Sequence, residues 1–66
     1  MTNITKLSDL IMSEEVSDRT IIHIYDAEGK FLAKGHWFQD QILDYAGRTG
    51  QATKPGTGLS INFRLA

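Results

Sequence analysis

Cysteine is absent from this chain of 66 residues, which excludes a disulfide framework, thiol catalysis and a cysteine-based zinc site. No charge of one sign prevails, because 7 basic and 8 acidic residues leave a formal net charge of −1. This balance gives neither the positive field of a strongly basic nucleic-acid-binding protein nor the acidity of a DNA mimic. No long hydrophobic run is present, so we expect no signal peptide, no membrane-spanning segment and a cytoplasmic location.

The short length limits the architecture to one domain, spanning residues 1–66. A domain of this size buries only about 60% of the surface that its unfolded chain exposes, so its core is thin. Since no disulfide supports this core, association into a homodimer is one available source of further stability.

Residues 20–35, TIIHIYDAEGKFLAKG, predict one complete β-hairpin with an apolar run on either side of a turn. Asp26 can cap the turn with its carboxylate, and Gly29 can adopt a positive φ without strain. The spacing fits a type I turn closed by a glycine bulge, which fixes the register between strands 20–25 and 30–34.

Two amphipathic segments predict helices, because apolar residues recur at helical spacing over 5–13 and over 36–46. Gly47 stands where a left-handed helix cap is expected. The glycine-rich residues 47–58 predict a long loop. Strict alternation of apolar and polar residues over 59–65 predicts a half-buried strand.

The sequence thus predicts an α+β fold with the element order α-β-β-α-β. The right-handed crossover rule favours segment 59–65 lying parallel to 30–34 and on the far side of 20–25. We expect a three-stranded antiparallel sheet, of order 2-1-3 when the strands are numbered along the chain, with both helices on one face. Segments 30–34 and 59–65 would form its two edges.

The hairpin register sorts the side chains into two faces, with Tyr25 opposite Phe31 and His23 opposite Ala33. One face is aliphatic and consists of Ile22, Ile24, Leu32, Leu59, Ile61, Phe63 and Leu65. The other face consists of Ile21, His23, Tyr25, Phe31, Ala33, Ser60, Asn62 and Arg64. We expect the helices to cover the aliphatic face, although the aromatic face offers more apolar area and is the alternative core. Apolar residues on the uncovered face would mark an interaction site.

Motifs for catalysis or metal binding are lacking. His36 and Asp40 have only the generic i, i+4 spacing, so we predict no metal site, no cofactor and no catalytic residue. The loop at 47–58 offers backbone N–H groups and cations that suit a phosphate, but it lacks the P-loop pattern, and a mobile, solvated connector is the favoured interpretation.

These observations predict a non-enzymatic binding protein. The candidate protein-binding residues are Tyr25, Phe31, His23, Trp37 and Arg64. The alternative is a small nucleic-acid-binding protein that uses the aromatic face and the basic loop. Its candidate residues are Arg48, Lys54, Arg64, Tyr25 and Phe31.

Residues 7–35 combine a short leading segment, LSDL, with the hairpin pattern I-x-I-Y-D-x-x-G-x-x-L-x-x-G that runs from Ile22 to Gly35. This combination resembles small proteins carried by phages and mobile elements of low-GC Gram-positive bacteria. The resemblance implies a short accessory protein in the cytoplasm of the bacterial host. Such proteins commonly regulate or block a host system. The resemblance therefore implies that the partner is a host protein, which includes a component of a defence system, as for an anti-CRISPR protein. It implies no catalytic or cofactor-binding residue.

Overall fold

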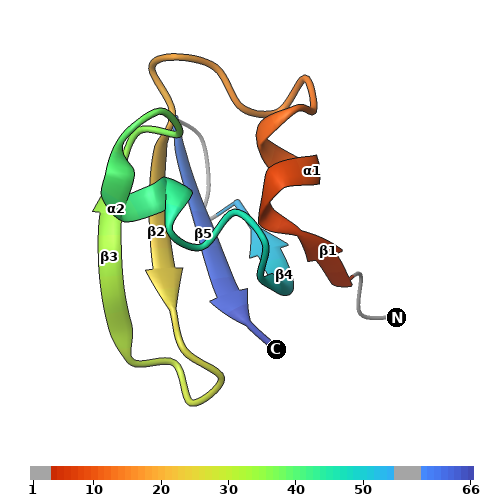
Figure 1. Cartoon of the computed structure of the whole chain (residues 1–66), viewed down its shortest axis with the longest axis vertical. Helices are drawn as coiled ribbons and strands as arrows, with labels where there is room; N and C mark the ends of the chain where they lie inside the picture. Colours follow the sequence, from red (N-terminus) through yellow and green to blue (C-terminus); the bar gives the residue numbers. More distant parts are fainter. Residues whose placement is uncertain (1–3, 55–58) are drawn as a thin grey trace.

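The computed structural model describes residues 4–54 and 59–66. It shows an α+β domain built on a five-stranded mixed sheet with the strand order β1-β4-β5-β2-β3 (Figure 1). The strands β2 and β5 run parallel, and the other three pairings are antiparallel. In chain order the elements are β1 Ile4–Lys6, α1 Leu7–Ile11, β2 Ile21–Tyr25, β3 Phe31–Gly35, α2 Asp40–Leu43, β4 Thr49–Thr53 and β5 Ser60–Leu65.

The prediction of a three-stranded antiparallel sheet is wrong. Segment 47–58, expected to be a loop, contains β4, and β1 lies where the first helix was expected to begin. The helical crossover that follows β3 therefore leads into β4, which runs parallel to β3. Because β5 then pairs antiparallel with β4, it runs parallel to β2 instead of antiparallel to it. The edges of the sheet are β1 and β3, and β5 is its central strand.

Both helices are shorter than predicted. In α1 the last turn ends where the Ser13 hydroxyl donates a hydrogen bond to the Leu10 carbonyl (2.6 Å), a side-chain bond that competes with helix extension. Only four residues of segment 36–46 are helical, and turns precede and follow them. Gly47 has no positive φ, so the predicted left-handed cap is wrong. Within residues 4–54 and 59–66, no helix combines the length and the apolar character needed to cross a membrane.

The turn of the hairpin is confirmed. The Asp26 carboxylate accepts hydrogen bonds from the backbone N–H groups of Glu28 (2.9 Å) and Lys30 (2.8 Å). The Asp26 carbonyl accepts another from Gly29, which has a φ of 87°. These bonds hold the two strands at a fixed spacing.

The register of the hairpin is confirmed only next to the turn, where Tyr25 lies opposite Phe31. A β-bulge follows, in which Leu32 is the extra residue, and it shifts every later pair by one position. As a result His23 lies opposite Lys34, and Ala33 moves to the other face of the sheet, correcting the prediction that it faces His23.

The core lies on the face of the sheet that both helices cover, as predicted for the aliphatic residues of β2 and β5. Its buried members are Leu7, Leu10, Ile22, Ile24, Ile42, Ile61, Phe63 and Leu65. Two residues predicted for this row are not buried: Leu32 stands at the bulge, and Leu59 precedes β5 and is 54% exposed.

Candidate functional site: the open face of the sheet

The face of the sheet opposite the helices, called the open face below, carries side chains from all five strands. Cross-strand pairing assigns them, because residues paired with one another point to the same side. One row crosses the sheet from Phe31 through Tyr25, Arg64 and Gln51 to Ile4. The open face consists of Ile4, Lys6, Ile21, His23, Tyr25, Phe31, Lys34, Thr49, Gln51, Thr53, Ser60, Asn62 and Arg64.

The strands of the sheet carry cations and no acidic side chain, whereas the acidic residues lie outside the strands. The described strands contain three cations, Lys6, Lys34 and Arg64, all on the open face, and no aspartate or glutamate. All eight acidic residues of the chain lie in the helices and in the segments that connect the elements. The open face is therefore locally cationic although the whole chain carries a formal charge of −1.

An aromatic pair occupies one corner of the open face. The rings of Tyr25 and Phe31 meet edge to face, with centroids 5.9 Å apart and planes at 69°. Phe31 is 50% exposed, on the edge strand β3, while Tyr25 is half-buried beside it. The pairing of Tyr25 with Phe31, between the turn and the bulge, holds these two rings opposite one another. Their exposed ring surfaces offer apolar contacts to a ligand.

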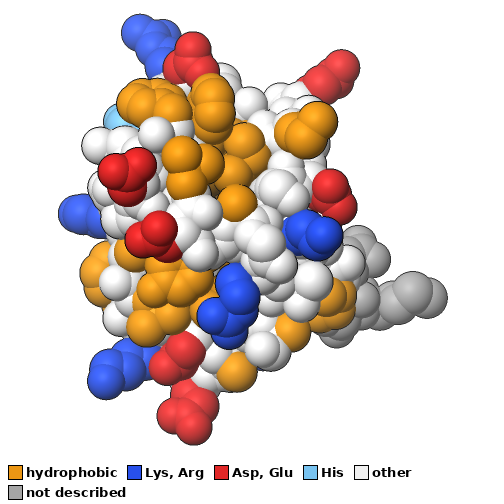
Figure 2. Space-filling view, viewed as in Figure 1, with side chains coloured by type: hydrophobic (Ala, Val, Ile, Leu, Met, Phe, Trp, Pro, Cys, Tyr) orange, Lys and Arg blue, Asp and Glu red, His pale blue; other side chains and the backbone are white. Residues whose placement is uncertain are grey.

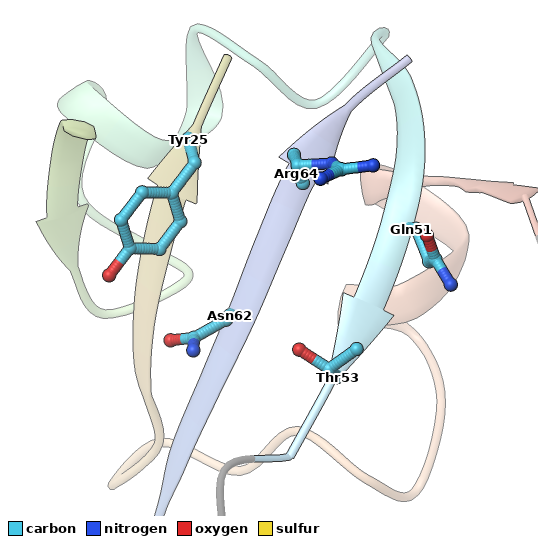
Figure 3. A pocket seen from close by; sticks show the side chains of 5 residues that line it. All are labelled: Tyr25, Gln51, Thr53, Asn62 and Arg64. Carbon is cyan, nitrogen blue, oxygen red and sulfur yellow. The ribbon is translucent and has the colours of Figure 1, made fainter. Parts of the chain in front are cut away.

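A polar hollow of about 260 Å³ lies beside the aromatic pair. Figure 3 shows how three neighbouring strands line it, with Tyr25 from β2, Asn62 and Arg64 from β5, and Gln51 and Thr53 from β4. The Asn62 side chain stands between Tyr25 and Thr53, and the Arg64 side chain extends toward β4. Amide, hydroxyl and guanidinium groups of this kind can donate hydrogen bonds to an anionic or polar ligand.

The structure brings together four of the predicted site residues, Tyr25, Phe31, His23 and Arg64, and separates them from a fifth. Trp37 packs against the hydrophobic core on the helix side, and its indole N–H donates a hydrogen bond to the Asp18 carboxylate (2.9 Å). The second helix was expected to begin at residue 36, but Trp37 lies in a turn before α2. It is therefore not part of the open face.

The two loop cations are also separated from the aromatic pair. Lys54 follows β4 and forms an ion pair with Glu15 (3.9 Å), a residue of the segment after α1. Arg48 precedes β4, at the opposite end of that strand, and its carbonyl accepts a hydrogen bond from the N–H of Leu7. The part of the predicted basic loop at 55–58 lies outside the described residues.

Several residues of the site were not singled out from the sequence. Gln51 and Thr53 belong to β4, which carries too few apolar residues for an alternation to be visible. Lys34 reaches the open face through the bulge. Asn62 had a usable signal, because the alternation over 59–65 already placed it opposite the buried row.

The described residues contain no cluster of three or more histidine, cysteine, aspartate or glutamate side chains that could hold a metal ion. His36 is not helical, so the helical spacing considered for His36 and Asp40 does not exist; the His36 Nδ1 instead lies 3.1 Å from the Thr20 carbonyl oxygen. What the open face combines is a stacking platform, hydrogen-bonding groups and positive charge. No family model matches this chain, and comparisons with curated proteins and with solved structures found no significant match.

Proposed function

We propose that this protein is a non-enzymatic binding protein whose open face holds single-stranded nucleic acid. The observation that carries this proposal is the coincidence of aromatic rings and cations on a sheet face whose strands contain no carboxylate. Base stacking on an aromatic side chain contributes about 1–3 kcal/mol per base and tolerates any sequence. Cations beside the rings supply the attraction to the phosphate backbone.

The arrangement on the face matches these two requirements. Tyr25 and Phe31 provide the platform, and Arg64 is paired directly with Tyr25 across β2 and β5. A base stacked on the rings would thus place its phosphate within reach of the guanidinium. Asn62 and Gln51 offer amides to the base edges.

Fluorescence anisotropy of a labelled oligothymidylate of about ten nucleotides, measured at low salt, tests the proposal. We expect binding that weakens steeply as salt is raised, because phosphate contacts release counterions. Phe31→Ala should weaken binding by about 5- to 150-fold, the range that loss of one stacked base implies. Leu43→Ala is the matched control, since Leu43 is a comparably exposed apolar residue of α2 on the helix side. Absence of binding by a folded wild-type protein would refute the proposal.

A second candidate function is the one that the resemblance implies, the binding of a host protein in the bacterial cytoplasm. The observation that favours it lies on the helix side, where several apolar side chains are exposed. Met12 is 85% exposed, Phe38 50% and Leu43 43%. Figure 2, which views the molecule from the same direction as Figure 1, shows hydrophobic side chains gathered in patches with acidic and basic side chains between them. Such patches are typical of protein interfaces.

Trp37 distinguishes the two candidates. Its ring packs edge to face against Phe38, with centroids 5.6 Å apart, on the helix side of the sheet. A protein partner that covers Phe38 should change the tryptophan emission. A strand without a terminal phosphate, bound at the aromatic pair of the open face, should leave the emission of Trp37 nearly unchanged while binding is registered by anisotropy.

A further inference from the structure

A second hollow of about 510 Å³ lies on the open face, at the end opposite the aromatic pair. Its lining combines two histidines, a lysine and a serine with less polar neighbours. The lining residues are Ile21, His23, Lys34, Gly35, His36, Gln39 and Ser60. No acidic side chain is among them, so the hollow offers one lysine and several hydrogen-bonding groups without a negative charge.

The wall of this hollow is held in place by hydrogen bonds. The Gln39 side-chain carbonyl accepts a bond from the His36 N–H (2.8 Å), which fixes the turn that follows β3. The His36 ring is positioned by the contact between its Nδ1 and the Thr20 carbonyl (3.1 Å), in which the ring nitrogen must be the donor. Its ring also stacks on Phe38, with planes at 5°. The Nε2 atom remains as the second hydrogen-bonding atom of the ring.

His23 carries an unmet hydrogen-bonding group. Its Nδ1 is shielded from solvent and has no partner among the described residues. A buried polar atom without a partner is destabilising, so a ligand or water that supplies one is favoured. His23 lies between Lys34 on β3 and Asn62 on β5, and the lysine adds a positive charge beside the ring.

We infer that this hollow binds the terminal phosphate monoester of the nucleic acid strand; the inference rests on the proposed function. A monoester carries close to two negative charges and three outward oxygens, whereas an internal phosphodiester carries one charge and two such oxygens. Four polar side chains from separate positions, His23, Lys34, His36 and Ser60, suit the monoester.

The distance between the two hollows fits a short nucleic acid strand whose end lies in the second hollow. Tyr25 and Ile21 are four residues apart on β2, which corresponds to roughly 13 Å along a strand. Bases stacked on Tyr25 and Phe31 would thus lie a nucleotide or two from a phosphate beside Ser60. The turn at 36–39 stands at this end of the face, where His36 and Gln39 line the hollow.

Three forms of the same oligothymidylate test the inference, with a 5′-phosphate, with a 3′-phosphate and with neither. We expect one phosphorylated form to bind wild-type protein about tenfold more tightly than the unphosphorylated form, the gain typical of charge-assisted hydrogen bonds. The phosphorylated form that binds more tightly identifies which end of the nucleic acid strand enters the hollow. Lys34→Gln and Ser60→Ala should remove most of this preference, while Lys30→Gln, in the turn before β3, should keep it.

The outcomes separate this inference from the proposed function. If all three strands bind equally, the inference is overturned and nucleic-acid binding stands. A phosphate preference that persists in both Lys34→Gln and Ser60→Ala also overturns it, because the phosphate is then bound elsewhere. If no strand binds, the proposed function and the inference both fail. If only a phosphorylated strand binds and the two variants abolish that binding, the assignment of the hollow as the phosphate-binding site is supported.

Discussion

Gly50 of β4 lies directly against the backbone of Arg64 in β5. A β-carbon at this glycine would collide with the Arg64 carbonyl oxygen and lie 2.9 Å from the carbonyl carbon. The glycine itself is buried and pairs with Leu65, the last core residue of the chain. The absence of a side chain therefore allows β4 to approach the central strand of the sheet.

We expect Gly50→Ala to lower the free energy of unfolding by about 2–3 kcal/mol, because the obstacle is backbone and cannot rotate away. Gly47→Ala is the matched control, since a β-carbon there meets nothing within 4 Å. It should be neutral or stabilising by up to about 1 kcal/mol, by restricting the unfolded chain. Urea denaturation followed by circular dichroism measures both. Equal stabilities of the two variants would contradict the close approach.

Gly50 also explains why β4 could not be predicted from the sequence. In the segment TGQAT the inward residues are Gly50 and Ala52, which are small because the sheet is close-packed there, and the outward residues are polar. No apolar alternation results, and glycines and a proline follow, so the pattern of a loop dominates. Because β4 was not predicted, the direction predicted for β5 was wrong. The alternation of β5 and the burial of its apolar residues were predictable.

Two leucines at the start and end of the last alternating segment should differ strongly in their effect on stability. Leu65→Ala should cost about 3 kcal/mol, because Leu65 is 5% exposed and its truncation leaves a cavity. Leu59→Ala should cost less than about 0.5 kcal/mol, since Leu59 is exposed and contributes its carbonyl rather than its side chain, accepting the N–H of Ile21. Thermal melts of both variants measure this difference in stability. A large loss of stability in Leu59→Ala would contradict the exposure of the Leu59 side chain.

The turn of the hairpin should depend on one side-chain oxygen. Asp26→Ala removes the acceptor of two backbone hydrogen bonds and should cost about 1 kcal/mol, which lowers the melting temperature by about 4–8 °C in a domain of this size. Asp26→Asn keeps an oxygen at the same place and should recover most of the loss. A melting temperature for Asp26→Asn as low as for Asp26→Ala would show that the charge, not the acceptor, matters.

The candidate site was predictable in part. Period-two alternation assigned Tyr25, Asn62 and Arg64 to one face, and these residues do share it. The bulge that turns Lys34 toward His23 has no sequence signal, because its extra residue is an ordinary leucine. Trp37 was assigned as a contact residue from its position beside Phe38, and its bond to Asp18 depends on a contact across 19 positions that no local pattern reveals.

The oligomeric state gives the last prediction. A homodimer through the edge of segment 59–65 is excluded by the pairing of β5 on both sides, so closure of two open faces over one another remains the expected mode. This mode would remove Phe31, Tyr25 and Ile21 from water. We expect light scattering to give a dimer for the wild type and a monomer for Phe31→Ser.

Leu43→Ser is the matched control, because Leu43 is an exposed apolar residue of α2 and should leave the dimer intact. Since the dimer would cover the same rings that stack bases, an oligothymidylate should convert dimer to monomer as it binds. A monomeric wild type would end the dimer hypothesis and leave the open face free for its ligand. A dimer that survives Phe31→Ser but not Leu43→Ser would instead place the contact on the helix side.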